Sequence, residues 1–178
     1  MNTLPLVDPS QATGQAAELL AAVKSHFGMT PNMTKAMANS PALLKGYLEL
    51  SGALGTGALA PGTQEQIALA VAQGNGCSYC LSAHSYLAEH VAHLSADDIN
   101  AARKSDASDA KTAALLQFAT AVNDNRGGIG SREFQAARAA GATDEEIAET
   151  IGHVALNVFT NYFNKAAGVE VDFPVVAV

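Results

Sequence analysis

Two cysteines, a histidine and a glutamate stand close together in the middle of the chain. They follow the pattern Glu65-x11-Cys77-x2-Cys80-x3-His84. The Gly-Asn-Gly sequence at 74–76 is expected to end one helix, so both cysteines fall in the first turn of the next helix. There, unpaired backbone N–H groups and the helix dipole stabilise an anion and lower the pKa of a thiol. The pattern therefore predicts a redox-active dithiol.

The spacing places the cysteines and the histidine for a thiol–disulfide cycle. Cys80 and His84 are four residues apart and share a helix face, so the imidazole can take the thiol proton or order a water that does. Cys77 is three residues before Cys80, close enough for a disulfide at the helix end. One thiolate can then attack a substrate, and the other can displace the product as the disulfide forms.

Two other interpretations of the cysteines stay open. Cys77, Cys80 and His84 are candidate metal ligands on one face, with Glu65 or another chain supplying the fourth. Zinc sites usually show two Cys/His pairs at such spacings, whereas this sequence has one. The third interpretation is a pair of buried, inert cysteines.

Glu65 and the other candidate residues have structural explanations as well. A glutamate in the first turn of a helix is favoured by the dipole, and its functional role would be to hold His84 or to receive a proton through it. Tyr79, between the cysteines, is expected to pack. His153, inside the apolar stretch IGHVAL, is expected to be a core histidine whose hydrogen bonds are satisfied. Polar surroundings predict surface positions for the remaining histidines: His26, His90 and His93.

The elements that position these residues are predicted to be helical throughout. Apolar residues recur at three- and four-residue spacing, and neither hairpin turn signals nor alternating β-branched runs indicate a sheet. Helices are expected at residues 11–27, 41–55, 61–74, 78–92, 96–104, 109–124, 131–140 and 143–165. Their expected N-terminal capping residues include Ser10, Thr63, Ser95 and Thr143. The fold class is therefore all-α.

A weak internal repeat relates residues 63–68 (TQEQIA) to residues 143–148 (TDEEIA), at an offset of 80 residues. On this register Asn157 takes the place of Cys77. We interpret the repeat as a possible duplication of a helical hairpin, in which only the first copy kept its reactive groups.

Length and composition exclude several classes of protein. The chain has 178 residues and a mass of 18.2 kDa, which fits one domain over residues 1–178. It is 48% hydrophobic and 15% charged, so it is not intrinsically disordered. A net charge of −7 and the lack of any basic run exclude nucleic-acid binding.

Targeting and assembly are predicted from the same patterns. The longest apolar run, residues 67–72, is too short to span a bilayer, and the first ten residues do not read as a secretory signal. We therefore expect no membrane partner and a cytoplasmic location, where structural disulfides are rare. Short, Ala-rich helices that are apolar around most of their circumference predict a homo-oligomer.

Residues 61–90 resemble the carboxymuconolactone decarboxylase superfamily, specifically its alkyl hydroperoxidase D-like, peroxidase-related branch. The stretch GCSYCLSAH at 76–84 carries the likeness, and NYFNKAAGVEVDFP at 161–174 adds to it. A looser likeness extends over a core of roughly 40–175. The resemblance implies an all-α fold of packed helical hairpins, assembled as homotrimers or homohexamers.

The resemblance also implies a thiol peroxidase, or alkyl hydroperoxide reductase, that needs no cofactor and serves antioxidant defence. Cys80 would attack a small hydroperoxide substrate, Cys77 would resolve the sulfenic acid, and His84 and Glu65 would form the proton relay. The positions of the cysteines agree with these roles. Cys80 is one turn before His84, and Cys77 is nearer the exposed helix end, where an outside thiol can reach it. Tyr79 stands where the family example has a histidine before its second cysteine, and many relatives carry tyrosine there.

The same resemblance implies that the reductant is an external dithiol, carried by the lipoyl group of an adaptor protein. Two alternative functions are a carboxymuconolactone decarboxylase-like lyase and a protein disulfide oxidoreductase with no peroxide substrate. Thiol alkylation would leave the first of these activities intact, and an assay of hydroperoxide consumption would separate the second from a peroxidase.

Overall fold

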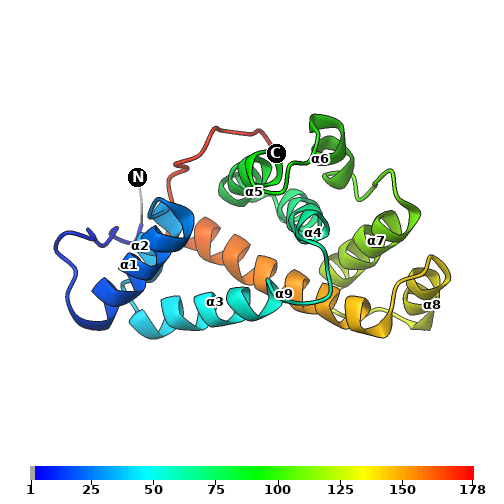
Figure 1. The fold of residues 1–178 in the computed structure, drawn as a ribbon, viewed down its shortest axis with the longest axis horizontal. Helices are drawn as coiled ribbons and strands as arrows, with labels where there is room; N and C mark the ends of the chain where they lie inside the picture. The colour runs from blue at the N-terminus through cyan, green and yellow to red at the C-terminus, as the bar shows by residue number, and fades with distance from the viewer. Residues whose placement is uncertain (1–2) are drawn as a thin grey trace.

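A computed structural model describes residues 3–178, which form nine helices and no strand (Figure 1). This all-helical architecture confirms the predicted fold class. The helices are α1 Gly14–Phe27, α2 Asn32–Met37, α3 Pro41–Leu54, α4 Pro61–Gly74, α5 Ser78–His90, α6 Ala96–Ala102, α7 Ala110–Asp124, α8 Ser131–Ala139 and α9 Asp144–Ala167. No helix in the described range is long and apolar enough to cross a membrane.

Helix α4 is the centre of the main core. It packs against α5, α6, α7 and α9, and residues 66–72 are all buried. A helix that is apolar around its whole circumference is stable only when neighbours cover every side. The helix expected at residues 61–74 is therefore confirmed, and its apolar run at 67–72 is buried.

Helix α9 is the longest helix and runs beneath several of the others (Figure 1). Its 24 residues contact α3 and α5 as well as α4, α7 and α8. Leu54 of α3 comes within 3.1 Å of the position that a Cβ on Gly152 of α9 would occupy, so glycine permits the close crossing of these helices. A second, smaller core joins α1, α2 and α3 around Leu20, Met37 and Leu44.

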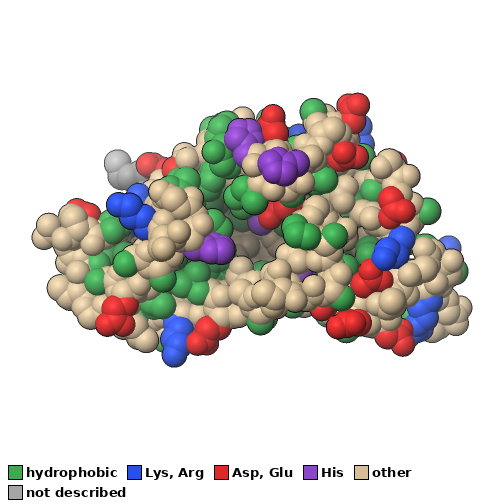
Figure 2. Space-filling view, viewed as in Figure 1, with side chains coloured by type: hydrophobic (Ala, Val, Ile, Leu, Met, Phe, Trp, Pro, Cys, Tyr) green, Lys and Arg blue, Asp and Glu red, His purple; other side chains and the backbone are tan. Residues whose placement is uncertain are grey.

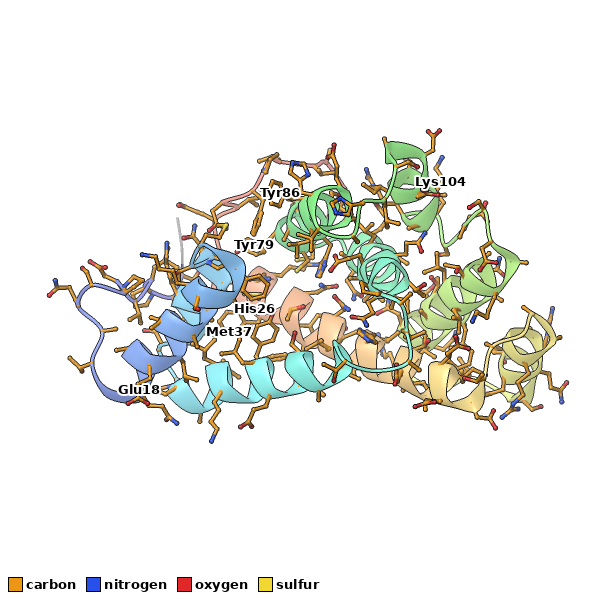
Figure 3. The ribbon with its side chains drawn as sticks, viewed as in Figure 1. Glu18, His26, Met37, Tyr79, Tyr86 and Lys104 are labelled. Atoms are coloured by element: carbon orange, nitrogen blue, oxygen red, sulfur yellow. The ribbon has the colours of Figure 1, made fainter. Side chains whose placement is uncertain are left out.

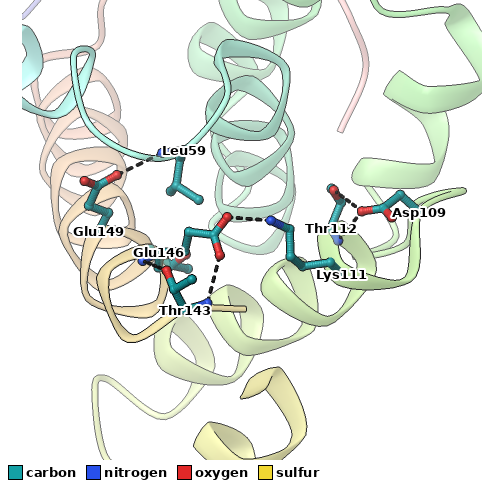
Figure 4. Close-up of polar contacts among 8 residues, drawn as sticks. Leu59, Asp109, Lys111, Thr112, Thr143, Glu146 and Glu149 are labelled. Carbon is teal, nitrogen blue, oxygen red and sulfur yellow. Dashed lines mark hydrogen bonds and ion pairs between the residues drawn. The ribbon is translucent and has the colours of Figure 1, made fainter. Parts of the chain in front are cut away.

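Polar contacts fix the start of α9 to its neighbours (Figure 4). Thr143 and Glu146 form a reciprocal capping box, as expected, and Glu146 also accepts a hydrogen bond of 2.6 Å from Nζ of Lys111 in α7. One turn further on, the carboxylate of Glu149 accepts backbone hydrogen bonds of 2.8 and 3.0 Å from Ala58 and Leu59. These contacts hold the loop before α4 against α9.

The C-terminal tail, residues 169–178, crosses the start of α5. Asp172 accepts a hydrogen bond of 2.8 Å from the Tyr79 hydroxyl and another of 2.8 Å from the backbone N–H of Asn32. The Phe173 ring lies 5.9 Å from each of the Tyr79 and Tyr86 rings, which are labelled in Figure 3. The tail therefore joins the N-terminal helices to the helix that carries the cysteines.

Several local expectations are wrong. Helix α1 begins at Gly14 with Thr13 as its N-cap, so Ser10 does not cap it, because residues 9–11 form a turn. Thr63 is not a cap either, since Pro61 already starts α4 after Ala60. The short helix α2 lay outside the predicted ranges.

The hairpin duplication is also wrong. Residues 144–167 form one uninterrupted helix, whereas the segment related to it by the repeat turns between α4 and α5. The difference follows from local sequence, since the glycines at 74 and 76 break the first segment and the second has none at those register positions.

Candidate active site

The turn between α4 and α5 places both cysteines. Gly76 has a φ of +60°, a left-handed conformation that favours glycine, and it directs the chain from α4 into α5 at Cys77. The side-chain amide of Asn75 donates hydrogen bonds of 3.0 Å to Asn123 and to Asn161. The turn is thus fixed to both α7 and α9.

The two thiols lie side by side at the N-terminus of α5. Cys77 is the N-cap residue, and its sulfur accepts a 3.3 Å hydrogen bond from the backbone N–H of Cys80. The two Sγ atoms are 2.7 Å apart, and both cysteines are free thiols. The side-chain amide of Asn164, on α9, lies 3.2 Å from the Cys80 sulfur. Very little movement is needed to bring the sulfurs within bonding distance.

The two thiols differ in acidity. The hydrogen bond from the Cys80 thiol lowers the pKa of Cys77 to about 7, against the opposing effect of burial, and the Cys80 N–H and the charges of His84 and Lys165 assist. The same contact, burial and the Cys77 charge raise the pKa of Cys80. In the reduced pair the first negative charge therefore resides on Cys77.

Glu65 and His84 form an ion pair beside the thiols. Nδ1 of His84 lies 2.8 Å from Oε2 of Glu65, and the side chains are only 24% and 22% exposed. Burial lowers the pKa of His84, but the charge and hydrogen bond of Glu65, together with the Cys77 charge, outweigh it and raise the pKa overall. The structure thus brings all four predicted site residues into one electrostatic unit.

A cavity of about 530 Å³ opens beside this unit. It is seen as the hollow in the middle of the face in Figure 2, and His26, labelled in Figure 3, stands at its side. Apolar walls come from α1, α3 and α9, while Glu65 and His84 supply polar groups. Other lining residues include Phe27, Tyr47, Leu48, His153, Leu156 and Asn157.

Tyr47 lines the cavity, and its acidity depends on the charges of the site. Burial raises its pKa to about 12, a hydrogen bond with Ser51 opposes the shift, and the charges of Glu65 and Cys80 add to it. Tyr47 therefore lies within electrostatic reach of Cys80, although neither cysteine lines the cavity itself.

The structure corrects the expected accessibility of Cys77. It is 1% exposed, and Cys80 is 2% exposed, so neither sulfur is open to an outside thiol in this conformation. The N-terminus of α5 is covered because α9 packs against that helix and the tail crosses its first turn. An external dithiol reaches the sulfurs only after this cover moves.

His153 and Tyr79 are buried as predicted, but their hydrogen bonding was not predicted correctly from the sequence. His153 is buried as expected, but its Nε2 has no hydrogen-bond partner, so its hydrogen bonds are not satisfied. Tyr79 packs as predicted and also donates to Asp172 of the tail. The surface positions of the other histidines are confirmed: His26, His90 and His93.

Asn164 is a site residue that the sequence reasoning missed. It follows Cys80 by 84 positions, and only the packing of α9 against α5 brings its amide to the sulfur. Among residues 3–178, no group of three or more His, Cys, Asp or Glu is arranged to hold a metal ion.

The segment that carries this site is similar to a known protein family. Residues 41–124, which include α4 and α5, match the carboxymuconolactone decarboxylase family. This segment of the chain is therefore similar to that family. A search of the curated proteins found no match.

Solved structures share the fold over nearly the whole chain. The alkylhydroperoxidase AhpD core of a peroxidase-related protein from Ralstonia eutropha JMP134 superposes with a TM-score of 0.85 at 22% identity, covering 96% of this chain and 92% of that one. A peroxidase-related protein from Silicibacter sp. TM1040 gives a TM-score of 0.78 at 22% identity, with coverages of 94% and 88%. The chain therefore has the fold of the alkylhydroperoxidase AhpD core.

A third similar structure is the debrominase Bmp8, with a TM-score of 0.79, 22% identity and coverages of 94% and 90%. A variant of Bmp8 in which one cysteine is replaced by alanine, in complex with 2,3,4-tribromopyrrole, gives a TM-score of 0.81 at 21% identity, with coverages of 95% and 91%. At these identities the likeness establishes a common fold.

Proposed function

We propose that this protein is a thiol peroxidase that reduces small organic hydroperoxides with the Cys77–Cys80 dithiol. The observation that supports this most is the contact of 2.7 Å between the two sulfurs beside the His84–Glu65 pair. The pair also lines a cavity large enough for a small organic molecule. A redox dithiol, a proton relay and a substrate space are thereby adjacent.

The first step is attack by Cys80 on the peroxide. The Cys77 thiolate takes the Cys80 proton across the short sulfur contact, and the Cys80 thiolate attacks the distal oxygen. The O–O bond breaks, Cys80 becomes a sulfenic acid, and the leaving alkoxide receives a proton from the His84 imidazolium. The raised pKa of His84 keeps that proton available, and Glu65 stabilises the charge.

The second step closes the disulfide. The Cys77 thiol attacks the Cys80 sulfenic acid, the S–S bond forms, and the hydroxyl group leaves as water with the Cys77 proton. An external dithiol then reduces the disulfide in two exchange steps and is itself oxidised to a disulfide. A lipoyl-bearing adaptor protein is the proposed donor, and the cytoplasm is the proposed compartment.

Assembly into a homo-oligomer is part of the proposal. Large apolar side chains stand exposed on the surface, although such groups are costly to leave in water. They include Phe27, Met29, Leu50, Ile151 and Tyr162. A trimer or a hexamer would cover them, and a solution mass of 18 kDa at micromolar dilution would contradict this part.

A second candidate is reductive removal of bromide from an aromatic ring. The shared fold of the debrominase Bmp8 and the cavity beside the dithiol favour it. In this reaction two thiols are oxidised to one disulfide. The carbon–bromine bond is replaced by a carbon–hydrogen bond, and bromide and a proton are released.

One panel of substrates tests both candidates. Purified protein is supplied with dihydrolipoamide and with cumene hydroperoxide, tert-butyl hydroperoxide, hydrogen peroxide, tribromopyrrole or an insulin disulfide. A peroxidase consumes hydroperoxide, a debrominase releases bromide, and a protein disulfide oxidoreductase reduces insulin alone. Loss of the activity in Cys80→Ser shows that the dithiol performs it. Full activity after alkylation of both thiols would overturn thiol catalysis and favour the lyase alternative.

A further inference from the structure

The sulfur of Cys80 has to carry a negative charge in a place that water does not reach. The residue is 2% exposed, so solvent does not stabilise its thiolate. The backbone N–H of Cys80, at the N-terminal end of α5, donates to the sulfur of Cys77 instead. A thiolate at Cys80 therefore depends on hydrogen-bond donors from neighbouring side chains.

Asn164 supplies such a donor from α9. Its side-chain nitrogen Nδ2 lies 3.2 Å from Sγ of Cys80 and 3.2 Å from Sδ of Met33, so the amide directs its N–H groups at two sulfur atoms. Asn164 is itself only 3% exposed. Because a thioether is a weak acceptor, the Cys80 sulfur gains most from this amide once it is charged.

The carbonyl oxygen of the same amide has no partner. Oδ1 of Asn164 is buried and accepts no hydrogen bond, which is unfavourable by itself. Turning the amide over would place this oxygen against the two sulfurs, which repels it when Cys80 is a thiolate. The observed orientation is therefore the one that suits a charged Cys80 sulfur.

The main contacts of Cys80 act against its thiolate. The hydrogen bond with Cys77, burial and the charge of Cys77 raise the pKa of Cys80, and the amide of Asn164 opposes them. A hydrogen bond to the charged form of an acid favours that form, so the amide lowers the free energy needed to move the Cys80 proton to Cys77. Other titratable groups close to the thiols are Glu65 of α4, His84 of α5, Tyr47 of α3 and Lys165 of α9.

We propose that Asn164 is a catalytic residue that donates a hydrogen bond to the Cys80 sulfur and stabilises its thiolate for attack on the substrate. The proton of Cys80 moves to Cys77, the electron pair stays on the Cys80 sulfur, and the amide N–H stabilises that charge until the sulfur forms its new bond. The attack on a peroxide rests on the proposed function, whereas the stabilised anion at Cys80 does not.

Alkylation measures the Cys80 thiolate without peroxide. The Cys77→Ser protein keeps Cys80 as its one thiol, since the chain has two cysteines. The thiolate displaces iodide from iodoacetamide and forms a sulfur–carbon bond, so the midpoint of the rate against pH gives the pKa of Cys80. Adding Asn164→Leu, which removes the donor, should raise this midpoint by about one to two pH units, and thus slow alkylation about 10- to 100-fold below the midpoint.

The pH profile separates a lost donor from a loosened fold. A looser fold changes the alkylation rate by the same factor at every pH, whereas loss of the donor moves the midpoint. Asn164→Asp keeps the size of the side chain, replaces the donor by a carboxylate and should move the midpoint at least as far.

Asn157→Leu is the matched control for the loss of a buried amide on α9. The Asn157 amide donates to the backbone carbonyl of His153 rather than to a sulfur, so its loss should leave the midpoint unchanged. Only the thiol pKa is compared in this variant, because Asn157 lines the cavity.

A second measurement needs no change at Asn164. In ¹⁵N-labelled Cys77→Ser protein, the side-chain amide resonance of Asn164, assigned through its own backbone, should shift with the same midpoint as the alkylation rate. This titration decides the question if neither Asn164 variant folds.

Three results would overturn the proposal: an unmoved midpoint in both Asn164 variants, an equal shift in Asn157→Leu, or an Asn164 amide resonance that does not follow the Cys80 titration. Because no peroxide is present, failure of the peroxidase assay and failure of this test are separate results.

Discussion

Glu65 and His84 join α4 to α5 through one short contact, 2.8 Å between Oε2 and Nδ1. The contact holds the imidazole at the wall of the cavity and, against the effect of burial, raises its pKa. It therefore links the shape of the site to its proton chemistry.

Removing the Glu65 charge should move the pH dependence of the peroxidase. In Glu65→Gln the pKa of His84 falls, so the imidazolium is lost at lower pH and the alkaline limb of the rate profile shifts toward acid. His84→Ala should slow oxidation of Cys80 by about 10²–10⁴-fold, the usual contribution of a positioned acid or base. Stopped-flow measurements of Cys80 oxidation across pH 5–9 give the pH profile of Glu65→Gln and the rate of His84→Ala. If the alkaline limb of the Glu65→Gln profile does not shift, the Glu65–His84 relay is contradicted.

The unequal roles of the cysteines can be read from intact-protein mass after a brief peroxide pulse. Cys80→Ser should gain no oxygen. Cys77→Ser should trap Cys80 as sulfenic acid and, with excess peroxide, as sulfinic acid, but more slowly, because the Cys77 thiolate that takes the Cys80 proton is missing. If Cys80→Ser is oxidised and Cys77→Ser is not, the roles are reversed.

The acidity of Cys77 should be visible in the ultraviolet. Thiolate absorbance at 240 nm in the reduced protein should rise with pH around an apparent pKa of about 7. Replacing Cys80 by alanine removes the main hydrogen bond to Cys77, so the transition should move to higher pH. An unchanged midpoint in Cys80→Ala would show that the sulfur contact does not set the acidity.

Acid should destabilise the protein partly through His153. Because its pKa in the fold is lowered, the unfolded chain takes up the proton first, and stability falls as pH drops below about 6.5 toward the folded value. His84 acts oppositely, since its raised pKa gives a contribution that is complete below about pH 6.5 and lost as pH rises. Urea unfolding at pH 5–8 measures this. In His153→Phe the free energy of unfolding should decrease less with falling pH than in the wild type, whereas His90→Gln should follow the wild type.

The start of α9 should depend on Glu146. Glu146→Ala removes the capping-box carboxylate and leaves Lys111 without its partner, at a cost of about 1–3 kcal/mol in the free energy of unfolding. Glu145→Ala, at the exposed neighbouring position in the same first turn, should change it by less than about 0.5 kcal/mol. Denaturant unfolding midpoints compare the two variants. If both lose the same free energy of unfolding, the contacts of Glu146 contribute little.

The helices and the grouping of Glu65, Cys77, Cys80 and His84 could be predicted because their determinants are local. Glycine breaks, apolar periodicity and i, i+4 spacing act within one or two helices. The cap at Thr63 failed for an equally local reason, since Pro61 starts the helix two residues earlier.

What the sequence did not predict depends on contacts between distant segments. Asn164 meets Cys80 only because α9 crosses α5, and the cover over Cys77 comes from that crossing together with the tail. The unpaired Nε2 of His153 depends on which atoms of α3 face α9. Hydropathy places such a histidine in the core without showing which of its nitrogens has a partner.

The tail contact also has a consequence for biosynthesis. Tyr79 is held by Asp172, and Cys80 meets Asn164, so the dithiol acquires its cover only when the last part of the chain is available. Ribosomes add about 5–20 residues per second, so the 92 residues from Cys80 to Asp172 take roughly 5–20 s to synthesise. During that time the nascent chain carries an uncovered dithiol, and its exposure to oxidants is greatest before the segment with Asp172 packs against Tyr79.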